Sequence, residues 1–310
     1  MKLKNMFIFF LLAVLLITGC SPKNEKVESS GKKTIVVTTT MHTDMVKNIV
    51  GDSAEVIGLI AEGVDPHLFT PGAKDVEIMQ NADIIVYAGL FLEGKMSEVL
   101  EGLAKQNKVV ISAGDGVSVD DLIEWDDDAS VHDPHVWFDT ALWKKECEYV
   151  SEQLIQAIPE AKDQIQSNKE KYLLEIDEAS KYVLDRANEL PQEKRVLVTA
   201  HDAFSYFARS NGFSVKGLQG ISTEAEAGTK DISNLADYIV ELKLPAIFVE
   251  SSIPTKTIEA VQAAVKAKGY DVKIGGELYS DSLGEKGSEA DTYIGMIKTN
   301  IDTIVDALKE

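Results

Sequence analysis

The chain has 310 residues, of which 45% are hydrophobic and 26% are charged. A chain of this length and composition can bury a substantial core, and its length favours two domains over one. The formal net charge is −20, with 51 acidic against 31 basic residues. This balance argues against a surface for nucleic acid or anionic membranes, because such surfaces need clustered lysine and arginine.

The start of the chain predicts a lipoprotein signal sequence. Lys2 and Lys4 form a short basic region, the twelve residues 6–17 are apolar, and small residues precede Cys20. Twelve apolar residues are too few for a transmembrane helix, which needs about 20. A plain cleaved signal peptide is the other alternative. We expect residues 1–19 to be removed and the lipid on Cys20 to anchor the protein at the extracytoplasmic face of the cell membrane.

The segment after this cysteine predicts a flexible tether over residues 20–33. Residues 21–33 are polar and contain proline, serine and glycine, and Val27 is their only apolar side chain. Such a segment cannot bury anything in a core.

From residue 34 onwards, short β-rich runs alternate with amphipathic helical runs in two blocks. The first block predicts strands at 34–40, 56–60, 82–88 and 108–112 and helices near 45–50, 73–81 and 96–105. The second predicts strands at 195–200, 214–218, 246–250 and 272–278 and helices at 203–211, 232–243, 254–267 and 291–308. Apolar strands that alternate with helices indicate parallel sheets covered on both faces. The sequence therefore predicts an α/β fold of two lobes, each with a mainly parallel four-stranded sheet.

A long helix is predicted between the two blocks. Residues 160–190 contain no glycine or proline, and from Tyr172 onwards apolar residues recur every three or four positions, which gives one apolar stripe. Pro191 closes the helix. The expected domains are an N-terminal lobe, a linking helix and a C-terminal lobe, at 34–156, 157–190 and 191–310.

Three of the five histidines, together with one aspartate, predict a metal site. His201 directly follows the 195–200 strand, His67 follows the 56–60 strand, and Asp281 follows the last predicted strand. Loops from several parallel strands converge beyond the carboxyl ends of those strands. His135 adds a third imidazole from the dense motif Val-His-Asp-Pro-His-Val-Trp-Phe-Asp. We expect one metal ion to be bound by His67, His135, His201 and Asp281.

Each of these histidines, taken alone, is more often a core or loop residue with a single hydrogen bond. Repetition favours the metal site, since Asp-Pro-His occurs at both 65–67 and 133–135 and proline restricts the backbone beside each ligand. Three aspartates are candidates to accept the second ring N–H, although most such aspartates are solvated or cap helices: Asp133, Asp139 and Asp202. Three imidazoles and one carboxylate suit tetrahedral zinc at ~2.0 Å, and manganese would bind the same atoms more weakly.

The remaining histidines and the second cysteine have simpler explanations. The strand-like run 136–138 favours an inward-facing His135, so His132 is expected at the surface. His42 lies at an apparent helix start, whose polarity explains it. Cys147 is expected on a small buried face of a helix.

These motifs resemble those of the metal-binding lipoproteins of ABC importers, the TroA-like and ZnuA-like solute-binding proteins. The resemblance covers essentially all of residues 33–310 and rests on the segments 65–67, 133–137, 199–204, 217–222, 247–252 and 276–281. It implies two α/β lobes joined by a rigid long helix, a buried Zn²⁺ or Mn²⁺ ion, and delivery to the membrane subunit of an ABC permease. It gives ligand roles to His67, His135, His201 and Asp281.

The resemblance leaves zinc and manganese both open. Family members that look manganese-selective often carry glutamate at the position of His201, which favours zinc here. Many dedicated zinc members insert a histidine-rich acidic loop before the second ligand, whereas residues 115–130 are acidic without histidine.

The predicted function is a receptor that captures Zn²⁺ or Mn²⁺ outside the membrane, with modest closure of the lobes, and presents it to a permease. We expect a monomer that is not an enzyme and binds no nucleic acid. One alternative is a zinc hydrolase with three histidines and a metal-bound water. Asp281 decides between the two, because a fourth protein ligand closes the site. A surface adhesin of the same fold is compatible with the tether.

Overall fold

The structure is a computed structural model that describes residues 31–125 and 128–309. The expected signal sequence at 1–19, the expected lipidation site Cys20 and most of the expected tether lie outside the described residues. The first strand begins at Lys33, the last residue of that tether. Residues 33–310 form one compact unit.

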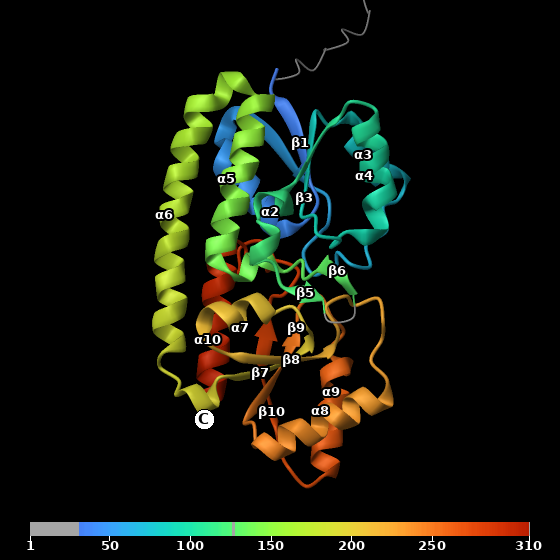
Figure 1. Cartoon of the computed structure of the whole chain (residues 1–310), viewed down its shortest axis with the longest axis vertical. Coiled ribbons are helices and arrows are strands. Elements are labelled where there is room, and N and C mark those ends of the chain that lie inside the picture. Colours follow the sequence, from blue (N-terminus) through green and yellow to red (C-terminus); the bar gives the residue numbers. More distant parts are fainter. Residues whose placement is uncertain (1–30, 126–127, 310) are drawn as a thin grey trace, which may run out of the picture. The chain divides into compact units, whose positions relative to one another are not determined.

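The first half is built on a four-stranded parallel sheet in the order β2-β1-β3-β4 (Figure 1). Its strands are β1 (Lys33–Val37), β2 (Ala54–Gly58), β3 (Ile84–Tyr87) and β4 (Val109–Ser112), and its helices are α2 (Thr40–Val50), α3 (Ala73–Asn81) and α4 (Ser97–Lys105). Ile35 and Val37 pack with α2, while Val36 between them packs with α3 and α4. Alternation along β1 thus places helices on both faces, as the sequence predicts.

The first strand ends earlier than expected, and α2 begins earlier. The threonine run 38–40 was expected to extend the strand, because β-branched residues favour strands. Instead, Thr39 caps α2, since its side chain accepts a hydrogen bond from the His42 backbone N–H. The helix therefore starts at Thr40 rather than near residue 45.

The second half holds four parallel strands that pair two by two. They are β7 (Val196–His201) with β8 (Ser214–Gln219), and β9 (Ala246–Glu250) with β10 (Lys273–Leu278). β7 and β9 lie next to each other, although no ladder of backbone hydrogen bonds joins them among the described residues. The helices of this half are α7 (Ser205–Asn211), α8 (Thr229–Leu242), α9 (Lys256–Ala267) and α10 (Tyr293–Lys309). The expected single four-stranded sheet is thus two adjacent parallel pairs.

The predicted long helix is α6 (Lys162–Ala187), which has 26 residues. Its buried residues, from Ile165 through Tyr172 to Ala187, follow the predicted stripe. The helix contacts α2 of the first half and α10 of the second, and Figure 1 shows it running beside both. The α/β fold with a parallel four-stranded sheet and one long helix is therefore confirmed.

One connecting element was not predicted, one was expected only as a helix around Cys147 without bounds, and one was predicted wrongly. A helix, α5 (Thr140–Ala157), packs against α6, and a short antiparallel hairpin joins β5 (Glu124–Trp125) to β6 (Asp128–His132). The strand-like run Val136–Phe138 is a 3-10 helix. Pro134 accepts from the Val136 N–H just before this turn, and Asp139 caps α5 just after it, so no room is left for an extended strand.

Asp44 is a half-buried carboxylate at the point where α2, α6 and α10 meet. Its Oδ2 accepts hydrogen bonds from the Tyr293 backbone N–H at 3.1 Å and from the Tyr172 hydroxyl at 3.4 Å. Burial raises the pKa of Asp44 to about 6, although these hydrogen bonds and the charge of Lys47 act in the opposite direction. The folded protein therefore binds this proton more tightly than the unfolded chain does.

The variant Asp44→Asn is expected to flatten the pH dependence of stability in the metal-free protein. Because the folded pKa lies above the unfolded one, the contribution of Asp44 to the free energy of unfolding falls as pH rises from about 4 to about 6. The rise of the Asp44 pKa from 3.8 to about 6 corresponds to a change of about 3 kcal/mol in the free energy of unfolding. Denaturant titrations of both proteins between pH 4 and pH 7 measure this. A wild-type minus variant difference that stays constant across the range would contradict it.

Candidate metal centre

The structure brings together all four residues that the sequence singles out. His67 lies in the loop between β2 and α3, His135 immediately precedes the turn at Val136–Phe138, His201 is the last residue of β7, and Asp281 follows β10. One ligand atom of each lies within 4.8 Å of the others, and all four side chains are buried. Segments that lie far apart in the sequence thus converge on one point.

The distances fit one tetrahedral ion. Nε2 of His135 lies 3.3 Å from Nε2 of His67 and 3.4 Å from Nε2 of His201. The oxygens of Asp281 lie 3.2 Å from Nε2 of His201, 3.3 Å from Nε2 of His135 and 3.8 Å from Nε2 of His67. Ligand atoms at about 2.0 Å from a tetrahedral zinc ion are about 3.3 Å apart. Several of these distances are close to that value, and all four ligand atoms lie within 4.8 Å of one another, so the four side chains are placed to surround one ion.

The carboxylate of Asp281 is buried beside the imidazoles of His135 and His201. Neither of its oxygens forms a hydrogen bond with any residue that the structure describes. Burial alone would raise the pKa of Asp281, but His201 and His135 hold it well below its ordinary value. A buried carboxylate without donors is unfavourable unless a positive charge lies beside it. A divalent cation at the centre of the four residues would supply that charge.

Two of the three imidazoles are held by buried carboxylates. Nδ1 of His135 lies 2.7 Å from Asp133, and Nδ1 of His201 lies 2.6 Å from Glu250. Each carboxylate also accepts the backbone N–H of the same histidine, at 2.9 Å in both cases. A proton on Nδ1 leaves Nε2 free for a metal, so these contacts fix the tautomer that coordination requires.

The same carboxylates set the charge of the metal-free site. Burial opposes protonation of every imidazole here, yet Asp133 and Asp281 raise the pKa of His135 to about 9. Glu250 and Asp281 likewise hold the pKa of His201 well above its ordinary value. No carboxylate holds Nδ1 of His67 among the described residues, and burial lowers the pKa of His67 to about 3. The site is thus built to hold positive charge.

Of the aspartates expected beside the ligands, only Asp133 binds an imidazole. Asp139 caps α5, and Asp202 accepts a hydrogen bond from the Ser205 hydroxyl at 2.9 Å. Glu250 was not predicted, because a single acidic residue at the end of a strand is no motif by itself. Its position at the carboxyl end of β9, beside β7, is the signal that could have found it.

A glycine allows β8 to pass close to His201. A Cβ atom at Gly217 would lie 2.5 Å from the Asp202 backbone nitrogen and 2.6 Å from the His201 carbonyl carbon. Such contacts are far inside van der Waals distance, so only glycine fits there. This close approach fixes the end of β7 and therefore the backbone that carries His201.

The other histidines lie outside the group of four. His42 is fully buried, with Nδ1 2.7 Å from the Thr39 hydroxyl and Nε2 3.4 Å from Glu146. The start of α2 explains the contact with Thr39 but not the one with Glu146. His132 was expected at the surface but is half-buried on β6. Cys147 is buried on α5, as expected.

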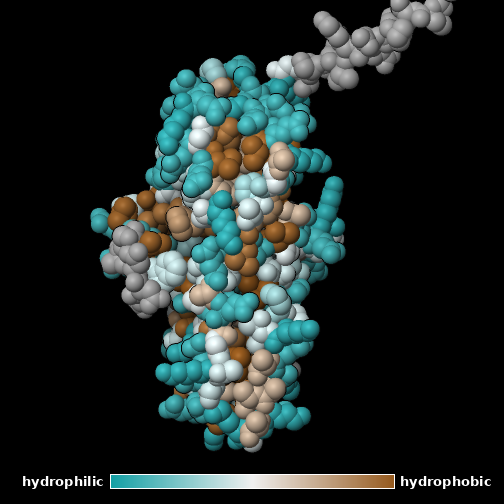
Figure 2. Space-filling view, turned by 90° about the vertical axis from the view of Figure 1, so that its right-hand side faces the viewer, coloured by the Kyte–Doolittle hydropathy of each residue, from teal (hydrophilic) through white to brown (hydrophobic). Residues whose placement is uncertain are grey.

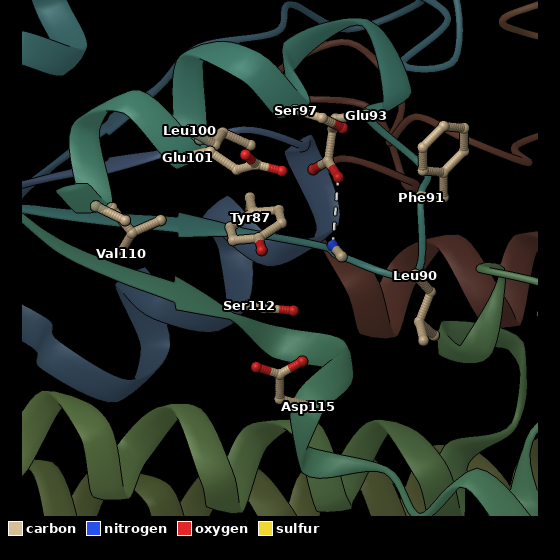
Figure 3. A pocket seen from close by; sticks show the side chains of 12 residues that line it. Tyr87, Leu90, Phe91, Glu93, Ser97, Leu100, Glu101, Val110, Ser112 and Asp115 are labelled. Atoms are coloured by element: carbon tan, nitrogen blue, oxygen red, sulfur yellow. Dashed lines mark hydrogen bonds between the residues drawn. The ribbon is translucent and has the colours of Figure 1, made fainter. Parts of the chain in front are cut away.

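A separate pocket of about 360 Å³ lies at the carboxyl ends of β3 and β4 (Figure 3). It contains none of the four candidate ligands, although Glu93, Glu101 and Asp115 line it. The Glu93 carboxylate is already occupied by the Thr38 hydroxyl and by the backbone N–H groups at positions 88 and 89. The metal ligands are therefore sought in the group of His67, His135, His201 and Asp281, whose ligand atoms lie close to one another, and not in this pocket.

The surface in Figure 2 is largely hydrophilic and carries separate apolar patches. Among the described residues, no helix is both long enough and apolar enough to span a bilayer.

Comparisons with known proteins agree with the fold and identify metal-binding proteins among the relatives. Over residues 35–307 the chain matches the family described as "Zinc-uptake complex component A periplasmic", ZnuA. The zinc-binding protein TroA of Treponema pallidum is 44% identical over 96% of each chain. The manganese-binding lipoprotein MntA of Bacillus subtilis is 38% identical over 96% of this chain and 97% of its own.

Solved structures show the same architecture. The structure described as the periplasmic zinc-binding protein TroA from Treponema pallidum superposes with a TM-score of 0.87 at 46% identity, over 90% of this chain and 99% of that one. The Fe(III)-bound YtgA of Chlamydia trachomatis gives a TM-score of 0.80 at 26% identity, over 89% and 98% of the two chains. By sequence and by fold, this chain belongs to the ZnuA family.

Proposed function

We propose that this chain is the extracytoplasmic metal-binding receptor of an ABC importer, which captures Zn²⁺ or Mn²⁺ and delivers it to a membrane permease. The observation that carries the proposal is the convergence of His67, His135, His201 and Asp281, whose ligand atoms lie within 4.8 Å of one another. Similar proteins are named as zinc-binding, as manganese-binding and as the substrate-binding lipoprotein of a manganese ABC transporter. These names support a transported metal as the ligand.

The donor set favours zinc. Three imidazoles and one carboxylate match its preference for nitrogen in a four-coordinate site, and at the same atoms manganese is expected to bind more weakly. Four protein ligands also leave no open position for an activated water, which a metal hydrolase needs. The protein is therefore a carrier and not an enzyme, and no feature of the site favours an adhesin.

Metal capture joins residues from two lobes. In this account the N-terminal lobe, residues 34–156, supplies His67 and His135, and the C-terminal lobe, residues 191–310, supplies His201 and Asp281. The linking helix at 157–190 resists wide hinge bending because α6 is continuous, so closure around the metal is modest. The protein acts as a monomer.

The anchor is the lipid on Cys20. Support comes from the motif that precedes this residue and from similar proteins that are named lipoproteins. The variant Cys20→Ala is expected to move the protein from the membrane fraction to the soluble fraction. Equal membrane fractions for the variant and the wild type would remove the anchor from the account.

Metal analysis of the protein purified without added metal tests the function. We expect one equivalent of bound metal and a competitive titration in which Zn²⁺ displaces Mn²⁺. A protein that binds neither ion at the one-to-one ratio would overturn the proposal.

A further inference from the structure

The His67 ligand is held differently from the other two imidazoles. Asp133 and Glu250 fix the rings of His135 and His201 through Nδ1. No such contact reaches Nδ1 of His67 from any described residue. A carboxylate instead holds its backbone, because the His67 N–H donates to Oδ1 of Asp65 at 2.8 Å. The orientation of His67 therefore depends on where Asp65 holds the loop.

Asp65 is in turn held from the other half of the chain. Its second oxygen, Oδ2, accepts a hydrogen bond from the Thr223 hydroxyl at 2.6 Å, across 158 residues of sequence. Asp65 is 8% exposed and Thr223 5%, so water has little access to replace this bond. One carboxylate thus connects Thr223 to the backbone of a candidate ligand.

The bond between Asp65 and Thr223 joins two loops. The His67 loop runs from β2 to α3, and Thr223 lies between β8 and α8. Elsewhere the loop reaches the second half through the Gly63 N–H, which donates to the Ser282 hydroxyl at 2.8 Å. Asp133 likewise lies two residues from its histidine, but among the described residues its carboxylate forms hydrogen bonds with His135 alone. Glu250 lies on β9 beside the strand of His201. Of the three imidazoles, only His67 is positioned by a carboxylate that is held from the other half.

We propose that the Thr223 hydroxyl and the Asp65 carboxylate form a latch that positions His67 and sets the rate at which the metal leaves. This inference rests on the proposed function. When the bond opens, the His67 loop keeps the Gly63–Ser282 bond but loses the bond that holds Asp65. His67, the ligand whose Nδ1 no carboxylate holds, then leaves first. The bound ion then has three ligands and one open position.

The variant Thr223→Val tests the latch, because valine keeps the shape of threonine and removes the hydroxyl. We expect the dissociation rate constant of Zn²⁺, followed by stopped flow with a chromogenic chelator, to rise about 10–100-fold, which is the usual effect of losing a partner that orients a ligand. The association rate constant should change far less. The melting temperature of the metal-free protein should fall by only a few degrees, because the buried Asp65 carboxylate loses one donor.

Two controls separate the latch from a general loss of packing. Thr223→Ser restores the hydroxyl and should return the dissociation rate to near the wild-type value. Lys95→Ala removes the exposed ion pair to neighbouring Glu224, at 3.9 Å, and should leave that rate nearly unchanged, because exposed pairs contribute little. If Thr223→Val fails to fold, Thr223→Ala removes the hydroxyl without the added methyl group.

The outcomes distinguish the latch from the function on which it rests. A hydroxyl-free variant that releases Zn²⁺ within about twofold of the wild-type rate would overturn the latch and leave the receptor intact. A Thr223→Ser variant that releases metal as fast as Thr223→Val would do the same. A wild-type protein that binds no Zn²⁺ would overturn the proposed function itself.

Discussion

Replacing His201 with alanine is expected to weaken Zn²⁺ binding by more than about a hundredfold. Loss of a residue that only orients a ligand already lowers metal affinity 10–100-fold, and His201 is itself a proposed ligand. The change also leaves the Glu250 carboxylate buried without its contact at 2.6 Å to the ring. Competitive titration against a chelator of known affinity measures the loss.

His132→Ala is the matched control for this variant. It removes the same kind of side chain three residues from His135, but His132 is not in the group of four. Its Zn²⁺ affinity should stay within a few-fold of the wild type. If His201→Ala bound metal as tightly as His132→Ala does, His201 would not be a ligand.

Zinc is expected to raise the melting temperature of the protein by about 8 °C when its free concentration is about a thousand times the dissociation constant. At that ratio, binding to the folded state alone stabilises the fold by about 4 kcal/mol, and each kcal/mol is worth roughly 2 °C in a chain of this size. The effect is large because the ligands come from four segments that unfolding separates. Thermal unfolding followed by circular dichroism, with and without Zn²⁺, measures it.

Asp281→Asn is the variant to compare in the same scan. Asparagine keeps the size of the side chain and removes the charge that offsets the cation. The zinc-induced shift should shrink strongly, while the metal-free variant still folds. An equal shift in the two proteins would show that zinc stabilises the fold from another site.

Elements with a readable apolar pattern were predicted well from the sequence, whereas those without one were not. The helix expected at 73–81 is α3 (Ala73–Asn81), and the strand expected at 246–250 is β9 (Ala246–Glu250). Both have several residues over which a period can be read. The run Val136–Phe138 is apolar and aromatic like a strand, but three residues carry no period. The proline before it and the helix cap after it decided its conformation.

A helix was expected around Cys147, but the bounds of α5 were missed because its buried side is not purely apolar. Glu146 and Ser151 are buried on it together with Cys147, so the apolar stripe is interrupted. Glu146 faces His42 within the core. Such a polar contact depends on a helix more than 90 residues away in the sequence, and no local pattern reports it.

The candidate site could be predicted because strand ends and the repeated Asp-Pro-His motif mark its residues. The structure brings His67, His135, His201 and Asp281 together, while their role as ligands stays a prediction. Glu250 and Thr223 could not be found in this way. Their importance arises only from what lies beside them in space, which is His201 for one and Asp65 for the other.

The most direct test is anomalous X-ray scattering from crystals grown with Zn²⁺, recorded on both sides of the zinc absorption edge. We predict a single strong peak about 2.0–2.2 Å from Nε2 of His67, His135 and His201 and from a carboxylate oxygen of Asp281. A peak elsewhere in the molecule, or a water in the coordination position assigned to Asp281, would contradict the account.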